Sequence, residues 1–371
     1  MQSKLRRRRE AALLLGVSLL LVLPAAVAAD RNAPATSSWN RAAAAQYLDS
    51  REVWWQGWDR AQKDHGTLCV SCHTQAPFAI ARPALHERGD EPTAAESAML
   101  ASVEKRVRLW KDVKPFYSDA VYGAGKEIES RNAEAVLNAI ILASNDSRQG
   151  HLRDVTRAAF DNAWALQSNS GLAAGAWVWQ DFDYTPWESK ESEYYWAAMM
   201  AEVVAGAPDN YRNDPTIVGN LAALRVYLLR SYAAQPLLNK MVVLWTSAQF
   251  PGLLTPAQRK TLIAEIVGRQ HADGGWSLTD LGAWKRRDNT PLETRSDGYA
   301  TGIALVSLEA NHIANSYVSR GIQWLVANQD KTTGAWTAWS LNKNRDPKSD
   351  AGPFMSDAAT AYAVLALTGQ R

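Results

Sequence analysis

The chain has 371 residues, 47% of them hydrophobic, so it is long enough to bury one large core or two modest ones. Its formal net charge at pH 7 is +2. The first 28 positions hold five basic residues and one acidic residue, and without them the net charge becomes −2. The remaining chain lacks the basic field that DNA or RNA binding requires, so we expect no nucleic-acid partner.

Residues 1–28 have the pattern of a Sec-type signal peptide. Lys4 and Arg6–Arg9 form a basic segment, residues 11–23 are apolar, and Ala26-Val27-Ala28 is a small-residue cleavage pattern. The apolar run is too short to favour a permanent membrane span. We therefore expect a periplasmic or secreted protein, with an uncleaved N-terminal anchor as the alternative.

The only two cysteines lie in the segment Cys69-Val70-Ser71-Cys72-His73. This is the C-x-x-C-H pattern of haem c attachment, in which each thiol adds across one vinyl group and the histidine supplies an iron ligand. Attachment takes place outside the cytoplasm, in agreement with export. The sequence therefore predicts haem c bound covalently through Cys69 and Cys72, with His73 as the axial ligand.

Three other interpretations of this segment stay open. The first is a thioredoxin-like redox pair, which normally occurs in a βαβ fold. The second is a zinc site, which needs more ligands than the single C-x-x-C of this chain supplies. The third is a small disulfide loop between Cys69 and Cys72. The sixth iron ligand is not fixed by the sequence. Its remote candidates, each of which has ordinary packing as the alternative, are His86, His151, His271, Met199, Met200 and Met355.

A repeated pattern occupies the C-terminal part of the chain. Gly274-Gly275-Trp276 and Gly334-Ala335-Trp336 lie sixty residues apart. Each follows a glutamine and precedes a Ser-Asp pair, and these are Gln270, Gln329, Ser296-Asp297 and Ser356-Asp357. A weaker third copy consists of Gln167, Gly175-Ala176-Trp177 and a helical stretch over 192–205. We expect the serine of each pair to cap the helix that follows.

Helical patterns dominate the chain from about residue 40 onward. Thr255-Pro256-Ala257-Gln258 is a capping box with proline at the first helical position. The patterns predict about eleven or twelve helices and no strands, and paired helices of this kind stack or close into a ring. We expect an N-terminal helical segment over 29–125, which holds the C-x-x-C-H motif, and a repeat region over 126–371.

The Gln…Gly-x-Trp units resemble the QW repeats of terpene cyclases and protein prenyltransferases, over roughly residues 150–371. The resemblance implies an all-α fold, the α/α toroid of alternating inner and outer helices. The whole chain also resembles secreted squalene-hopene-cyclase-like proteins that carry Cys-Val-Ser-Cys-His-Thr, which implies no firm activity.

Class II cyclases of that family protonate an alkene with an aspartic acid in a D-x-D-D motif. Here the corresponding segment is Asp181-Phe182-Asp183-Tyr184, where tyrosine replaces the last aspartate. Asp183 then corresponds to the catalytic acid of the family but lacks its acidic neighbour. The alternative is that Asp181 and Asp183 are ordinary loop residues. Prenyltransferase activity needs a zinc-ligating cysteine, which would conflict with haem attachment.

The chain has sixteen tryptophans. Trp54, Trp55 and Trp58 share one helix face close to the C-x-x-C-H motif, and with Trp110 they are candidates to cover a porphyrin. We also expect the inner helices to enclose an apolar pocket with aromatic walls, formed by residues such as Trp187, Tyr194, Tyr195 and Tyr299. Packing within the core is the alternative for each of these side chains.

Together these features predict a periplasmic haem c protein on an α/α toroid. We expect electron transfer or oxidation, a redox partner protein and a hydrophobic, isoprenoid-like ligand. The alternatives are a cyclase-class enzyme with a degenerate acid motif and a non-catalytic binding protein with a Cys69–Cys72 disulfide. A glycosidase would need two inward carboxylates, for which Glu191, Glu193 and Asp297 are the candidates.

Overall fold

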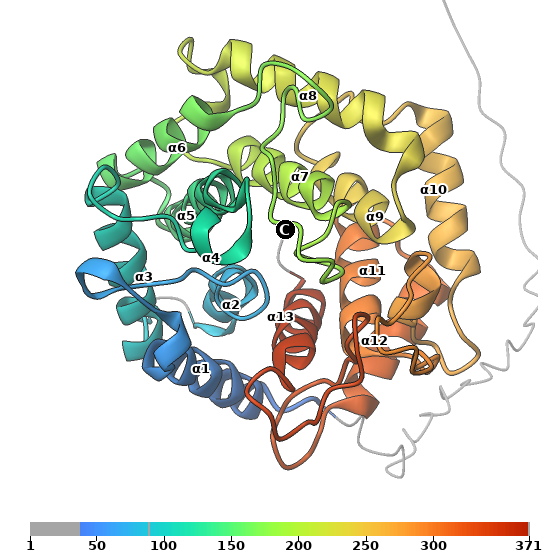
Figure 1. Cartoon of the computed structure of the whole chain (residues 1–371). Helices are drawn as coiled ribbons and strands as arrows, with labels where there is room; N and C mark the ends of the chain where they lie inside the picture. Colours follow the sequence, from blue (N-terminus) through green and yellow to red (C-terminus); the bar gives the residue numbers. More distant parts are fainter. Residues whose placement is uncertain (1–37, 88–89, 370–371) are drawn as a thin grey trace, which may run out of the picture. The chain divides into compact units, whose positions relative to one another are not determined.

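The helices alternate between an inner and an outer ring along the chain (Figure 1). The structure, a computed structural model, describes residues 38–87 and 90–369, so the predicted signal peptide lies outside the described residues. The inner helices are α2 (Gln75–Ala81), α5 (Lys126–Gln149), α7 (Ser192–Ala205), α9 (Leu237–Thr246), α11 (Gly298–Ala310) and α13 (Phe354–Thr368). Each contacts the next one in this order, and α13 contacts α2, so the ring is closed.

The outer helices pack against this inner ring. They are α1 (Arg41–Gly57), α3 (Ala94–Arg108), α6 (Asp154–Leu166), α8 (Val218–Ser231), α10 (Pro256–Gly268) and α12 (Ser316–Asn328). A single turn, α4 (Asp119–Tyr122), precedes α5. The described strands are β1 (Gln62–Lys63) and β2 (Thr67–Leu68), which form one short hairpin. The predicted all-α toroid is confirmed, with twelve helices of the described residues in its two rings and α4 as an addition. The expectation of no strands is wrong at this one hairpin.

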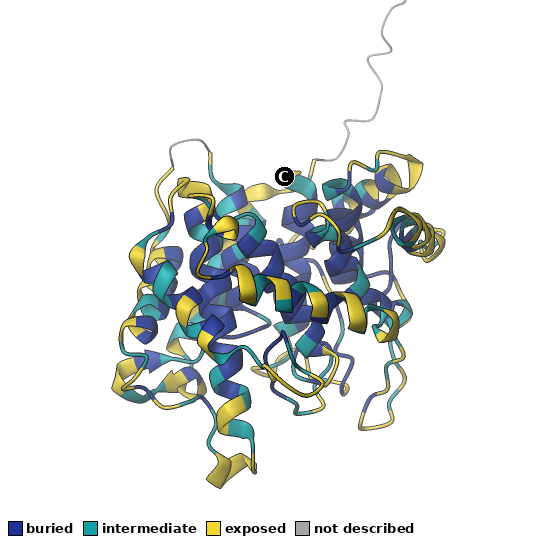
Figure 2. Ribbon diagram, turned by 90° about the horizontal axis from the view of Figure 1, so that it is seen from above, coloured by how far each residue is buried: buried dark blue, intermediate teal, exposed yellow. Residues whose placement is uncertain are grey.

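Burial differs between the rings for a reason that the sequence already contains. Almost every residue of α7, α11 and α13 is buried, because these helices are apolar on all sides. By contrast, α10 buries only Leu262 and Ile266, and charged residues occupy much of its exposed surface. Figure 2 shows the buried inner helices enclosed by helices with exposed outer faces.

The N-terminal helices belong to the ring. The sequence suggested that residues 29–125 form a segment outside the toroid, whereas α2 lies between α13 and α5 in the inner ring and α1 contacts α13. From Ser38 onward the described chain is one compact unit. The heptapeptide of α2 is too short to carry a helical period, so only tertiary packing reveals its place.

The three repeats make equivalent contacts, which explains their residue pattern. Each glutamine side chain donates to the carbonyl of the repeat glycine and to a carbonyl at the start of the next outer helix. The acceptors are Gly175 and Asn220 for Gln167, Gly274 and Tyr317 for Gln270, and Gly334 and Asn40 for Gln329. Each tryptophan indole donates to a carbonyl of the preceding outer helix, at Ala163, Ile266 or Leu325. In the third case the next outer helix is α1, so Gln329 joins the two ends of the ring.

The capping prediction is correct at Thr255, whose side chain and that of Gln258 form a capping box for α10. It is wrong at the Ser-Asp pairs. Asp297 caps α11 by accepting from the backbone N–H of Ala300, whereas α13 begins at Phe354, before Ser356-Asp357. A carboxylate accepts these hydrogen bonds as well as a serine hydroxyl does, so sequence rules do not separate the two. No helix in the described ranges is long and apolar enough to cross a membrane.

We predict that Gly334→Ala destabilises the fold by about 2–4 kcal/mol. Gly334 has φ +79°, and a Cβ there would lie 2.5 Å from the carbonyl oxygen of Ala43 in α1. The matched control is Gly219→Ala in α8, where a Cβ meets nothing within 4 Å and alanine favours the helix. Urea unfolding followed by tryptophan fluorescence measures both changes. Equal effects of the two substitutions would contradict the requirement for glycine where this turn approaches α1.

Candidate functional site

A cavity of about 650 Å³ lies at the N-terminal ends of inner helices, and we call it the His73 cavity. His73 precedes α2, Phe354 and Met355 begin α13, and Thr185–Glu188 lie in the loop before α7. The lining also includes Trp55, Trp58, Arg60, Lys63, Cys69, Tyr117, Tyr122, Tyr184, Lys343 and Arg345. Its walls are therefore mainly aromatic, and its charged lining is mainly cationic. The volume lies within the range of roughly 300–1,000 Å³ usual for small-molecule and cofactor sites.

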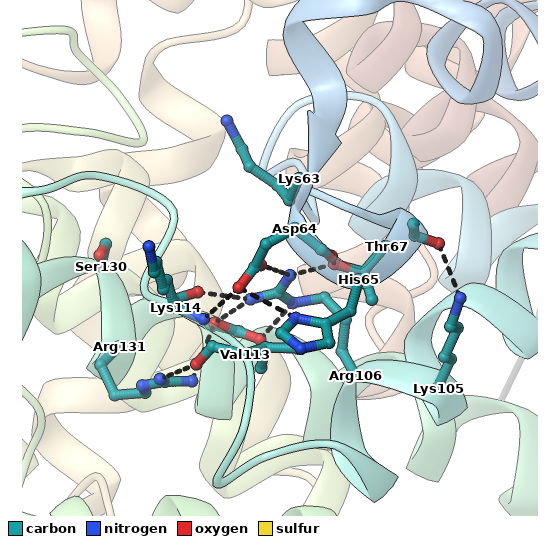
Figure 3. Close-up of polar contacts among 12 residues, drawn as sticks. Lys63, Asp64, His65, Thr67, Lys105, Arg106, Val113, Lys114, Ser130 and Arg131 are labelled. Carbon is teal, nitrogen blue, oxygen red and sulfur yellow. Dashed lines mark hydrogen bonds and ion pairs between the residues drawn. The ribbon is translucent and has the colours of Figure 1, made fainter.

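The segment before Cys69 is held by a buried arginine, Arg106 of α3 (Figure 3). Its guanidinium makes two bonds to the carboxylate of Glu134, at 2.5 and 3.0 Å, and donates to the hydroxyl of Thr67 in β2 at 2.5 Å. It also donates to the carbonyl of Lys114 and lies 3.9 Å from Asp64 beside β1. One fully buried ion pair thus fixes the hairpin from which the Cys69 segment emerges.

His73 is oriented by a chain of hydrogen bonds. Its Nδ1 lies 3.0 Å from the hydroxyl of Thr74, and that hydroxyl donates to Asp357 of α13 at 2.8 Å. Because the Thr74 proton goes to Asp357, its oxygen accepts from Nδ1–H of His73, which leaves the Nε2 lone pair free. The ring of Phe354 stacks on the imidazole with 3.6 Å between the ring centroids, and the ring of Trp55 packs edge-on against it.

The imidazole is neutral in this setting. Burial lowers the pKa of His73 to about 3, with Arg51 and Arg345 contributing in the same direction. A neutral imidazole with a free Nε2 is the form that binds metal ions. Thr74, the next residue in the chain, fixes this form, and Asp357, which orients Thr74, comes from the far end of the sequence.

The two cysteines differ in position. Cys69 lines the cavity, and its carbonyl accepts from the indole of Trp55 at 2.8 Å, whereas Cys72 is buried and is not in the lining. They are not joined by a disulfide in the structure. Burial raises the pKa of the Cys69 thiol to about 12 and that of Cys72 above its ordinary value. Thiol redox pairs need a lowered thiol pKa, so the environment does not favour thioredoxin-like exchange.

One carboxyl group, Glu188, also lines the cavity. Burial raises the pKa of Glu188 to about 7, and Arg345 across the cavity opposes that rise. A carboxyl group with a pKa in this range can both take up and release a proton near neutral pH. Sequence reasoning missed Glu188, because nothing local marks this half-buried glutamate as lining the same cavity as Cys69 and His73.

Of the six candidates for a sixth iron ligand, Met355 alone lies in the lining of the His73 cavity. His86 pairs with Glu96, His271 pairs with Asp280, and His151 is exposed. Met200 is fully buried in α7, and Met199 lines a different cavity. The C-x-x-C-H histidine and one of the predicted sulfur candidates are therefore brought together by the fold.

The acid candidates of the sequence do not meet in the His73 cavity. Asp181 accepts from the backbone N–H of Asp183, and Asp183 is exposed with φ +56°, so both behave as loop residues. An exposed aspartate lacks the burial that holds a cyclase acid neutral. Asp183 and Glu191 instead line a neighbouring cavity of about 600 Å³, here called the Asp183 cavity. The other glycosidase candidates lie elsewhere: Glu193 accepts from Tyr227 and Asp297 caps α11.

The aromatic predictions are correct only in part. Trp54, Trp55 and Trp58 pack together, but Trp55 and Trp58 alone reach the cavity. Trp110 packs under Arg131. Trp187 lines the cavity, whereas the predicted pocket residues Tyr194, Tyr195 and Tyr299 are fully buried in the core. Their hydroxyls find partners within the protein instead of facing a ligand: Tyr194 donates to the carbonyl of Leu228 in the outer helix α8, and Tyr299 donates to Tyr195.

Among residues 38–87 and 90–369 there is no group of three or more His, Cys, Asp and Glu side chains that could hold a metal ion. The zinc interpretation of Cys69, Cys72 and His73 requires such a group.

No family model matches the sequence, and no curated protein matches it. The backbone is similar to three solved glycosidase structures: two variants with glutamate replaced by alanine, one of them in complex with glucose, and a variant with phenylalanine replaced by tyrosine. In each comparison the identity is 12% and the TM-score is 0.51, over 89% of this chain and 98% of the other. At this identity the likeness extends to the fold alone.

We predict that Glu134→Gln lowers the free energy of unfolding by about 3–5 kcal/mol, because it leaves the guanidinium of Arg106 buried without its counter-charge. The matched control is Glu293→Gln, which removes an exposed ion pair to Arg295 and should cost less than about 1 kcal/mol. Urea unfolding followed by tryptophan fluorescence distinguishes the two. A loss at Glu134 no larger than that of the control would contradict the role given to Arg106.

Proposed function

We propose that this protein is an exported c-type haem protein that holds haem in the His73 cavity and acts in electron transfer or oxidation. The observation that carries the proposal is that Cys69 and His73, from one C-x-x-C-H motif, line a single aromatic-walled cavity of about 650 Å³. The export signal in residues 1–28 supplies the compartment in which haem c is attached.

The lining suits the two chemical parts of a haem. Trp55, Trp58 and Trp187 offer flat apolar surface to a porphyrin. Lys63, Lys343 and Arg345 offer cations to its two propionates. The buried position of Cys72 is the part of the motif that fits least directly, because haem attachment uses both thiols.

The surrounding residues would orient and isolate the group. Thr74 and Asp357 fix the tautomer of His73, as hydrogen-bond acceptors do for metal-ligating histidines, and Phe354 fixes the plane of its ring. When bound, haem c supplies one-electron oxidation and reduction at its iron. Glu188 is then the carboxyl group placed to move a proton when the charge in the cavity changes.

Two partners complete the proposal. A redox protein would exchange electrons at this end of the toroid. A hydrophobic, isoprenoid-like ligand would contact the aromatic wall, as the resemblance to cyclases implies. Oxidation of such a ligand is the enzymatic form of the proposal, and electron transfer alone is the non-enzymatic form.

A glycosidase is the second candidate. Two carboxylates, Asp183 and Glu191, line the Asp183 cavity, and the fold is similar to that of solved glycosidases. Hydrolysis of an aryl glycoside that is lost in both Asp183→Asn and Glu191→Gln would favour this candidate over the haem proposal.

We expect the protein, exported in a host with a cytochrome c maturation system, to carry haem that survives denaturing electrophoresis. The double variant Cys69→Ala/Cys72→Ala should lose this covalent haem, because both attachment sulfurs are removed. Val70→Ala, in the same segment, is the control and should keep it. Haem staining and the reduced absorption spectrum give the readout. A colourless wild-type protein with a Cys69–Cys72 disulfide would contradict the proposal.

We further expect Met355 to be the sixth ligand. Met355→Leu conserves volume but removes the sulfur, so the variant should bind carbon monoxide at least about tenfold faster than the wild type. Met199→Leu, outside the His73 cavity, is the matched control and should behave as the wild type. Absorption spectroscopy after mixing with carbon monoxide measures the rate. An unchanged rate in Met355→Leu would contradict this assignment.

A further inference from the structure

A separate cavity, the Glu202 cavity, lies at the opposite end of the inner ring from the His73 cavity. Its volume is about 490 Å³. The six inner helices of the described chain all contribute to it near their C-terminal ends, through residues such as Ile80, Ser147, Glu202, Trp245, Ala310 and Leu365. The inner helices therefore run parallel, with the His73 cavity at their N-terminal side and the Glu202 cavity at their C-terminal side.

A layer of tyrosines separates the two cavities. Tyr195 of α7 lies at 3.1 Å from Tyr299 of α11 and at 2.5 Å from Tyr362 of α13, measured between hydroxyl oxygens. Trp187 of the His73 cavity donates to the hydroxyl of Tyr299, and Trp245 of the Glu202 cavity packs edge-on against Tyr362. A ligand in one cavity thus makes no direct contact with a ligand in the other.

Glu202 is an incompletely satisfied carboxyl group. Its side chain is 6% exposed, and its Oε1 accepts from the amide of Gln249 at 3.1 Å. Its Oε2 has no hydrogen-bond partner, and no ion pair within the described residues involves Glu202. Burial accordingly raises the pKa of Glu202 to about 7. A buried carboxylate in this state is unfavourable unless a hydrogen-bond donor approaches it.

The surroundings favour a positive ligand. The last carbonyl groups of an α-helix lack intrahelical partners and carry the negative end of its dipole, and six helices end around this cavity. The indole of Trp245 adds an aromatic face, which attracts cations. Two basic side chains also line the cavity: Arg148, whose guanidinium donates to the carbonyl of Pro83, and the exposed His312.

Part of the remaining lining is apolar, beside the polar side chains of Ser144, Ser147 and Gln249. Met199, Val203 and Leu365 supply aliphatic surface beside Glu202. A primary ammonium group has three donors and no acceptor, which matches the unpartnered carboxylate oxygen of Glu202. A short aliphatic tail would match the apolar surface.

We propose that the Glu202 cavity binds a primary alkylammonium ion, with its ammonium group on the free oxygen of Glu202 and its alkyl chain against Trp245 and Met199. This site is independent of the His73 cavity and of haem. It adds a small-molecule binding function to the end of the toroid that the proposed redox function does not use.

Isothermal titration of the purified wild-type protein with butylammonium chloride near pH 8 tests the proposal, because Glu202 is mostly ionised and the amine protonated there. We expect saturable binding, with butanol and butyrate at least about tenfold weaker. Glu202→Gln should weaken butylammonium binding about tenfold or more. Glu265→Gln, an exposed glutamate on α10, is the matched control and should bind as the wild type.

Trp245→Leu is a second variant that keeps the test decisive if Glu202→Gln fails to fold. It should weaken butylammonium binding about threefold or more through loss of the aromatic face. Three results would each overturn the proposal: no binding of butylammonium at millimolar concentration, equal binding of butanol, or full affinity in a folded Glu202→Gln or Trp245→Leu protein. Loss of haem in the cysteine variants would leave the expected titrations unchanged.

Discussion

The carboxylate of Asp357 joins the two ends of the toroid. It lies in the first turn of the last inner helix, and it accepts hydrogen bonds from Tyr47 and Arg51 of α1 and from Thr74 before α2. Burial raises the pKa of Asp357 above its ordinary value, so these three donors are what make a carboxylate tolerable there. Closure of the ring and orientation of His73 therefore depend on the same group.

Parallel inner helices make the two ends of the toroid chemically different. At the N-terminal ends, long loops bring together His73, Cys69, Glu188 and several cations. At the C-terminal ends, Glu202 and Trp245 line the second cavity. The helix dipole has opposite signs at these ends, so an anionic group such as a propionate is favoured at one and a cation at the other. The tyrosine layer between them keeps the two environments apart.

The repeat could be recognised in the sequence because its glutamine, glycine and tryptophan each contact their own repeat or an adjacent helix. Gln270 and Trp276 bond to carbonyls of their own repeat or its nearest neighbours along the chain, and Gly274 has a positive φ with an adjacent helix packed against it. Contacts of this kind recur whenever the unit recurs. The apolar pocket was misassigned because an inward aromatic residue has the same sequence pattern whether it lines a cavity or, like Tyr299, fills the axis.

The sequence by itself determined the helical class, the repeat unit and the C-x-x-C-H motif, since each is a pattern written along the chain: a helical period, a recurring unit and a five-residue segment. Only the tertiary structure decided that α1 and α2 complete the ring, that Met355 shares a cavity with His73, and that Asp183 does not. Those relations join residues hundreds of positions apart, such as Thr74 and Asp357. Because they arise from closure of the ring and not from local preference, no pattern along the chain records them.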